Sequence, residues 1–417
     1  MRTFIDPVSY PLLPTVKKME WKGGDFKFDF KHISVQLDQT FVEIQSIIKS
    51  ELEQLGFQKV SFNDQNHPYH MSFNTGVSVP EKIKKVLNKE RFPLQSYFLT
   101  VDSDQIAIYA LNKQGALYGL ATFRQLLLNQ VNGGIPSVEI VDGPDVEKRI
   151  ISPTLTWYAG FARVGFGMQL WEGEQWKQFV DWCYRHKINA LNIVMYGFWP
   201  FEFPEYPETV MKDIKMKTWS SEINDWLEVS FTHPNLRKPF LEELISYANA
   251  RGIEIYAYIG MNSYSGGYPV VHPESRTVLS EELKEKGFVN NYDSMCTSRE
   301  DVRKYLIASV KRIEELGFDG LVFEESEEVQ WFCQCEECQR KYGHLSPNDA
   351  KHTVSIELLK EYEKVLNPDT LIGIRWLREP PIVKDIEVLK EWESRLPKRV
   401  KLFWAPGLED DDREFMK

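Results

Sequence analysis

A run of acidic residues stands at the end of a predicted strand. The apolar stretch FDGLVFEE (318–325) predicts that strand, and four glutamates with one serine fill residues 324–328. Packing several carboxyl groups together raises the pKa of at least one, because like charges disfavour ionisation. A protonated carboxylic acid beside a second polar group is what cleavage of a glycosidic bond requires. The run therefore predicts acid chemistry on a sugar, although glutamate runs also occur on solvated faces.

Aromatic side chains recur at the ends of the other predicted strands. They account for 13% of the chain, with 12 Trp. Aromatic faces stack on sugar rings, but they also fill large cores and rims. The predicted sugar platforms are Trp157, Tyr196, Trp199, Tyr258, Trp376 and Trp404. Asn262, after the third strand, is a predicted polar contact.

Strands and helices alternate from about residue 150 onwards. The predicted strands are 153–159, 188–197, 252–260, 318–325, 370–377 and 399–406, and the helices between them cover 174–187, 236–252, 299–317 and 351–366. Continuous apolar strands in repeated strand–helix units are typical of a (β/α) TIM-type barrel, whose reacting groups lie at the carboxyl ends of the strands. Six strands are visible where such a barrel has eight, so we expect a barrel that is incomplete: either truncated or open.

The first part of the chain has a different pattern of predicted strands and helices. Short alternating strands surround two helical stretches, FVEIQSIIKSELEQLGF and GALYGLATFRQLLLNQ, and a Gly-Pro pair stands near residue 144. We predict a small N-terminal α+β domain over residues 1–145 and a (β/α) barrel catalytic domain over residues 146–417.

Composition narrows the possible partners. With a formal net charge of −11, the chain has no overall positive field to attract the phosphates of a nucleic acid. No stretch of the sequence is long and apolar enough for a transmembrane helix. Neither a nucleic acid nor a membrane is therefore expected as a partner. The first residues show no signal-peptide pattern, so the expected location is cytoplasmic. The oligomeric state stays open.

Three of the five cysteines lie close together, at Cys333, Cys335 and Cys338. Three thiolates at this spacing can hold a structural zinc ion, with His344 or another cysteine as fourth ligand. The alternative is a set of reduced thiols that shape the loop behind the carboxylates. Cys183 and Cys296 are interpreted as small buried apolar residues.

A resemblance to a known family rests on Gly115-Ala-Leu-Tyr-Gly-Leu-Ala-Thr-Phe-Arg-Gln-Leu126. This stretch resembles the helix that ends the N-terminal domain of family 20 β-N-acetylhexosaminidases. Arg149, ISYANARGIEIYAYIGM (245–261) and CTSREDVRKYL (296–306) resemble the barrel of the same family, in the same order. The likeness extends over about residues 25–330 and implies Arg149 as a further sugar contact.

The acidic run departs from the family's pattern. Family 20 enzymes end the fourth strand in His-x-Gly-Gly-Asp-Glu, where this chain has Phe-Glu-Glu-Ser-Glu-Glu (323–328). Aligned at its end, the pattern implies Glu327 and Glu328 as polariser and acid, in either order, with Glu325 in reserve. Ser326–Glu327 is also similar to the Ser-Glu of α-glucuronidases, and Glu324–Glu325 to the paired Asp of O-GlcNAc-hydrolase-like enzymes.

Together these observations predict a glycoside hydrolase that cleaves terminal (N-acetyl)hexosamine-type sugars with a carboxylate pair, and the leading mechanism is one in which the substrate's acetamido group assists. No cofactor is required for that chemistry, and the expected partner is an oligosaccharide or glycoconjugate substrate. Three alternatives stay open: an α-glucuronidase-like or other glycosidase, a carbohydrate-binding barrel without catalysis, and a zinc-dependent hydrolase.

Overall fold

The computed structural model describes residues 3–4, 11–129, 134–156, 168–264, 266–285, 294–325, 333–377 and 386–405. The chain divides into two compact units. The first comprises Met1–Ile150, Lys177–Ala190 and Ser246–Ile253; the second comprises Ile151–Trp176, Leu191–Ile245 and Glu254–Lys417. The predicted domain boundary after residue 145 stays a prediction.

A mixed sheet forms the centre of the first unit. Its strands, in spatial order, are β1 (Thr3–Phe4), β2 (Lys18–Lys27), β8 (Gly134–Asp142), β6 (Tyr97–Val101), β7 (Ile106–Ala110), β5 (Met71–Asn74), β3 (Ile33–Leu37) and β4 (Val60–Phe62). Its helices are α1 (Gln45–Gln54), α2 (Glu81–Leu87) and α3 (Lys113–Leu128), with 3-10 turns η2 (Gln39–Ile44), η3 (Gly76–Ser78) and η4 (Pro93–Gln95). The predicted small α+β architecture is confirmed.

Helix α3 explains the most specific motif of the sequence. The Asn112 side chain caps it by accepting a hydrogen bond from the Gln114 amide. A Cβ at Gly119 would lie 2.7 Å from Ile108 of β7, so only glycine lets the helix approach the sheet this closely. The motif is therefore a requirement of helix-on-sheet packing.

Strand β2 was missed from the sequence because a glycine pair interrupts it. Gly23 and Gly24 both have positive φ, and the pairing with β8 shifts register between Trp21 and Asp25. Such a bulge breaks the alternation on which sequence-based strand prediction depends.

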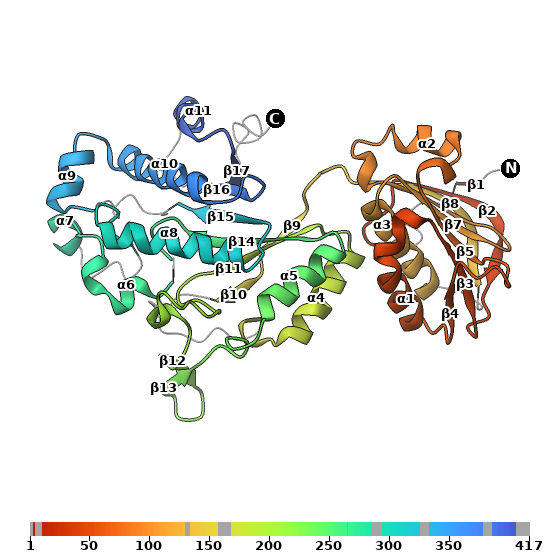
Figure 1. Ribbon diagram of the computed structural model, residues 1–417, viewed down its shortest axis with the longest axis horizontal. Coiled ribbons are helices and arrows are strands. Elements are labelled where there is room, and N and C mark those ends of the chain that lie inside the picture. Colours follow the sequence, from red (N-terminus) through yellow and green to blue (C-terminus); the bar gives the residue numbers. More distant parts are fainter. Residues whose placement is uncertain are drawn as a thin grey trace. The chain divides into compact units, whose positions relative to one another are not determined.

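A curled parallel sheet dominates the second unit (Figure 1). Its strands run in chain order: β10 (Thr154–Thr156), β11 (Ala190–Met195), β14 (Glu254–Gly260), β15 (Gly320–Glu324), β16 (Leu371–Leu377) and β17 (Val400–Ala405), with β9 (Ile150–Ile151) also on β11. Sequential order without reversal is the winding of a barrel, not of a doubly wound sheet. The predicted strands and the incomplete TIM-type architecture are confirmed.

Helices connect these strands as the sequence predicted. They are α4 (Gly173–Arg185), α5 (Phe240–Ala250), α6 (Tyr268–Val271), α7 (Glu281–Glu285), α8 (Glu300–Glu315), α9 (Glu336–Tyr342), α10 (Pro347–Val365) and α11 (Ile386–Arg395), with 3-10 turns η5 (Met168–Leu170), η6 (Pro207–Thr209) and η7 (Pro273–Ser275). The Phe323 ring of β15 stacks on Tyr362 of α10 at 4.8 Å. Because side chains alternate along a strand, Phe323 marks the outer face of the sheet and Glu324 must point to the inner face.

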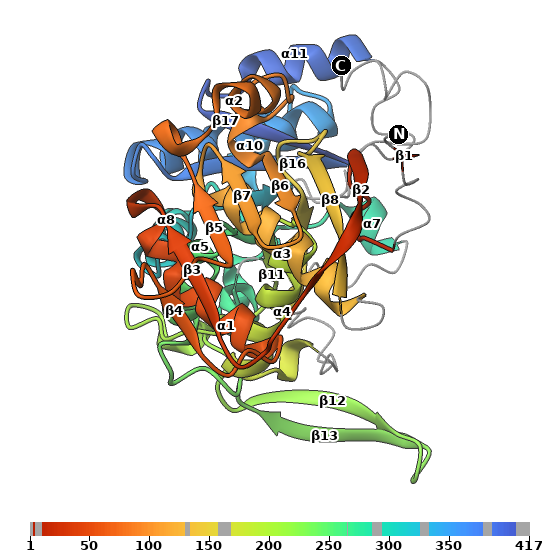
Figure 2. The ribbon, with the colours of Figure 1, turned by 90° about the vertical axis from the view of Figure 1, so that its right-hand side faces the viewer.

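A two-stranded hairpin, β12 (Ile214–Ser220) and β13 (Asp225–Phe231), was not predicted. It projects away from the parallel sheet at the bottom of Figure 2. Trp219 and Trp226 are register partners in it, with ring centroids 5.6 Å apart. In the part of the chain that the structure describes, no helix is long and apolar enough to cross a membrane.

Candidate active site

The carboxyl end of β15 brings an ion pair to the inner face of the parallel sheet. Glu324 is the last residue of β15 and is the register partner of Gly260 on one side and Arg375 on the other. The Arg375 guanidinium lies 2.5 Å from the Glu324 carboxylate, which is only 3% exposed, whereas a third of the arginine side chain is exposed. A cation that solvent can reach therefore lies beside a buried carboxylate.

Tyrosines extend this ion pair into an aromatic wall. The Arg375 guanidinium also donates to the Tyr258 hydroxyl at 2.7 Å. The ring centroids of Tyr258 and Tyr196 are 5.6 Å apart, and those of Tyr196 and Tyr264 are 5.1 Å apart. The structure thus brings Tyr196 and Tyr258 together with Glu324 and Arg375. Both tyrosines are buried, each 5% exposed, so they support the site from behind and the prediction of sugar platforms there is not supported.

Glu325 points the other way. It is buried, and its carboxylate lies 3.2 Å from Nδ1 of His352, a fully buried histidine of α10 that stacks on Trp392. Burial opposes ionisation of Glu325, but the hydrogen bond and the charge of His352 outweigh it, so the pKa is lowered. A carboxyl group that ionises more readily is a poor proton donor at neutral pH, and this arrangement does not favour Glu325 as the acid.

Glu327, Glu328 and Trp157 lie outside the described residues. Trp376 and Trp404 are register partners on β16 and β17, so the two platforms predicted at these strand ends are neighbours along the sheet edge.

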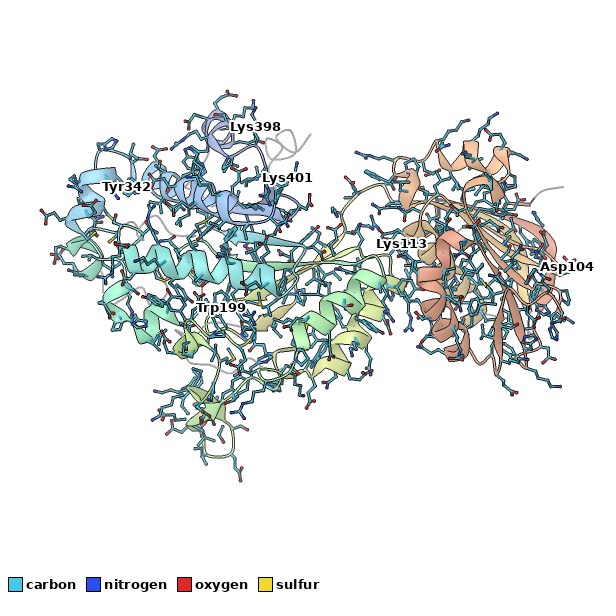
Figure 3. All side chains as sticks on the ribbon, viewed as in Figure 1. Asp104, Lys113, Trp199, Tyr342, Lys398 and Lys401 are labelled. Carbon is cyan, nitrogen blue, oxygen red and sulfur yellow. The ribbon has the colours of Figure 1, made fainter. Side chains whose placement is uncertain are left out.

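Trp199 does not offer its ring to a ligand. It is fully buried, stacks on Phe201, and donates from Nε1 to the Tyr305 hydroxyl of α8 at 2.9 Å (Figure 3). A Cβ at Gly266, where φ is +69°, would lie 2.5 Å from the same nitrogen. The prediction of a sugar platform at Trp199 is not supported, because the hydrophobic neighbours of this large side chain exclude solvent from it.

The two predicted polar contacts are engaged with the protein itself. The Asn262 amide donates to the Met295 carbonyl at 3.0 Å and so joins two loops. Arg149 donates to the Lys187 carbonyl and the Tyr118 hydroxyl, each at 2.7 Å, and lies beside the first residue of β11. That is the amino end of a parallel strand, so the structure does not bring Arg149 to the edge that carries Glu324.

Sequence reasoning missed Arg375, Tyr264 and His352 as members of this region. Arg375 had a usable signal: it lies near the end of the next predicted strand, and parallel strands in register place it beside Glu324. His352 had none, since it belongs to a helix 27 residues away from Glu325.

The cysteines form the one candidate metal site found among the described residues. Cys333, Cys335 and Cys338 lie together as predicted, and Cys296 joins them. The interpretation of Cys296 as a merely apolar residue is therefore wrong, because its sulfur faces other sulfurs. Cys183 is buried elsewhere, where burial raises the pKa of its thiol to about 12.

Comparison with known proteins finds a family model that matches the N-terminal part of the chain. Residues 9–143 match the model described as glycosyl hydrolase family 20, domain 2. A β-hexosaminidase of Akkermansia muciniphila is 24% identical over 253 residues, which is 58% of this chain. The chain spans about half the length of this curated relative, since the match covers 47% of it.

Solved structures share the fold of the whole chain. A β-N-acetylhexosaminidase from Bacteroides fragilis superposes with a TM-score of 0.68 at 14% identity, covering 97% of this chain and 72% of the other. A family 20 β-N-acetylhexosaminidase from Streptomyces coelicolor superposes with a TM-score of 0.65 at 13% identity, covering 99% of this chain and 73% of the other. Residues 9–143 therefore match a family 20 domain, and the chain shares the fold of β-N-acetylhexosaminidases.

Proposed function

We propose that this protein is a glycoside hydrolase that releases terminal N-acetylhexosamine-type sugars at the carboxyl edge of its parallel sheet. The observation that carries the proposal is the convergence of Glu324, Arg375 and the tyrosine wall on the edge where barrel enzymes react. The family 20 domain and the hexosaminidase relative support the same class of substrate.

The described carboxylates leave the role of acid to other members of the acidic run. Glu324 is paired with Arg375, and Glu325 is held beside His352 with a lowered pKa. We therefore keep Glu327 and Glu328 as polariser and acid, with their order open. They follow Glu325 by two and three residues in the sequence.

The proposed reaction begins when the acid protonates the glycosidic oxygen. In substrate-assisted cleavage the acetamido oxygen of the sugar attacks the anomeric carbon, and the polarising carboxylate orients that acetamido group. Water then opens the cyclic intermediate and returns the proton to the carboxylate. No cofactor enters this sequence.

Several residues would contact the sugar. Arg375 is the proposed polar contact, because its exposed part can donate hydrogen bonds to hydroxyl groups without leaving Glu324. Stacking would come from Trp376 and Trp404 at the neighbouring strand ends, while the buried rings of Tyr196 and Tyr258 would support Arg375 from behind.

A second candidate is a carbohydrate-binding barrel without catalysis. The observation that favours it is that both described carboxylates of the run are already engaged, with Arg375 and with His352. Such a protein would bind sugars, with a change in tryptophan fluorescence, and would form no product.

Turnover of chromogenic glycosides distinguishes these candidates. The panel contains β-N-acetylglucosaminide, β-N-acetylgalactosaminide, α-glucuronide and plain hexosides. Glu327→Gln and Glu328→Gln are compared with Glu222→Gln, the same change at an exposed glutamate of the hairpin. Removing a general acid should lower the rate about 10²–10⁴-fold.

The expected result is turnover of an N-acetyl substrate that at least one of the two site variants loses and the control retains. Full turnover in both site variants would refute the assignment of the acid. Preferential turnover of the α-glucuronide would favour the α-glucuronidase-like alternative. Sugar binding without any product would establish the binding barrel.

A further inference from the structure

Three separate segments of the second unit meet at a cluster of sulfur atoms. Residues 275–278, 294–298 and 333–338 are joined by backbone hydrogen bonds: Cys296 N–H donates to the Ser275 carbonyl at 2.8 Å, and Gln334 N–H donates to the Val278 carbonyl at 2.8 Å. Two of these segments carry the cysteines that converge. The cluster is thus built into a supported framework.

Four sulfurs lie within one coordination sphere. The Sγ atoms of Cys296, Cys333, Cys335 and Cys338 are all within 4.8 Å of one another, and all four cysteines are free. Cys296 Sγ lies 3.7 Å from both Cys335 Sγ and Cys338 Sγ. Tetrahedral zinc with bonds of about 2.3 Å to sulfur places neighbouring sulfurs about 3.8 Å apart.

Polar hydrogens are aimed at these sulfurs. Val278 N–H donates to Cys333 Sγ at 3.3 Å, and Cys338 N–H donates to Cys335 Sγ at 3.5 Å. Ser298 Oγ lies 3.1 Å from Cys338 Sγ. Donors of this kind stabilise the negative charge of thiolate ligands and hold them in place around a metal.

We propose that Cys296, Cys333, Cys335 and Cys338 bind one Zn²⁺ ion in a closed tetrahedral site. The ion replaces four thiol protons, so the site carries a net charge of −2. Four thiolates leave no open position for water or substrate, and the metal therefore has a structural role.

The spacing of the sulfurs favours a single ion such as zinc over a cluster. Tetrahedral sulfur sites hold zinc or iron–sulfur clusters. An iron–sulfur cluster inserts several atoms between its thiolate ligands, and sulfurs 3.7 Å apart leave no room for them. A single ion fits.

The site would fasten two connections of the barrel to each other. Cys296 precedes α8, and Cys335 caps the N-terminus of α9. Helix α9 is held in turn on α10, where the Tyr342 hydroxyl (Figure 3) donates to Glu357 at 2.8 Å. In the sequence, Cys333 stands five residues after Glu328, the last residue of the acidic run.

Metal analysis of the full chain tests the proposal independently of any glycosidase activity. The protein is purified under reducing conditions from zinc-supplemented cells, and zinc and iron per chain are determined by mass spectrometry. Cys296→Ser removes the ligand that only the fold brings in, and Cys183→Ser is the matched control at a buried cysteine outside the cluster. Cys335→His keeps a zinc ligand at the partly exposed position.

The expected result is one zinc per chain in the wild type, in Cys183→Ser and in Cys335→His, with loss of zinc in Cys296→Ser. In the cobalt-substituted protein, the thiolate-to-metal absorption should fall by about a quarter in Cys335→His, because one of four thiolates is replaced. Less than stoichiometric zinc in the wild type, iron in its place, or full zinc retention in Cys296→Ser would overturn the proposal.

Discussion

Replacing Arg375 by methionine tests whether the pair with Glu324 holds the sheet edge together. Methionine keeps much of the apolar stem but removes the guanidinium from a carboxylate that is 3% exposed. Removing one partner of a fully buried pair costs about 3–5 kcal/mol. Because a third of the arginine side chain is exposed, water compensates part of the loss, and we expect about 2–3 kcal/mol.

Calorimetry converts this free energy into a measurable shift. For a unit of this size, each kcal/mol lowers Tm by about 2–4 °C, so Arg375→Met should lose roughly 4–12 °C in the transition of the second unit. Arg340→Met is the matched control, because Arg340 is 72% exposed and pairs with Glu337 on the surface of α9. Its effect should stay below about 1 kcal/mol.

A double variant separates pairing from general damage. If the two groups interact, Glu324→Gln combined with Arg375→Met should lose less than the sum of the single changes, by about 1–2 kcal/mol. Additivity within about 0.5 kcal/mol, or an Arg375→Met shift no larger than that of Arg340→Met, would refute the reasoning.

Three further predictions concern acid stability and packing. The pKa of Glu325 is lowered, since the hydrogen bond and charge of His352 outweigh burial, so its stabilisation is present above the unfolded pKa of about 4.3 and is lost as the pH falls through the lower folded value. The Tm advantage of the wild type over Glu325→Gln should therefore stay constant above about pH 5.5 and shrink as the pH falls below about 4.3, and a constant difference throughout would contradict it. Burial lowers the pKa of His233 to about 4. As the pH falls, this imidazole is therefore protonated in the unfolded chain before it is protonated in the folded one. The free energy of unfolding should accordingly fall by up to roughly 3 kcal/mol from about pH 6.5 to pH 4. His233→Asn should flatten that part of the Tm profile, and an unchanged profile would exclude this cause. Gly266→Ala should lower Tm by an amount equivalent to roughly 2–4 kcal/mol, because φ is +69° and the new methyl group meets Trp199, whereas a shift under about 2 °C would show that the loop can move aside.

Local patterns in the sequence were sufficient to predict the order of the barrel elements. The strand predicted over residues 318–325 is β15, Gly320–Glu324, and the helix predicted over 299–317 is α8, Glu300–Glu315. Apolar runs and helical spacing depend only on residues that are close in the sequence, so they can be recognised without knowing the fold. The β12–β13 hairpin was missed because β13 is largely exposed and its pattern does not mark a face packed on a core.

The sequence also located the acidic run at a strand end, but it could not divide the glutamates by role. Glu324 and Glu325 are adjacent in the chain, and the pleat of the strand sends them to opposite sides. One meets Arg375, 51 residues later, and the other meets His352, 27 residues later.

Distance along the chain also hid the complete cysteine cluster and the burial of Trp199. The C-x-C-x-x-C spacing identified three of its four cysteines, whereas Cys296 lies 39 residues before Cys335 and is brought to it only by folding. The sequence pattern around a tryptophan at a strand end is the same whether its ring faces a ligand or packs in a core. The tertiary structure decides between these outcomes, because the burial and charge partners of a side chain depend on which distant segments pack against it.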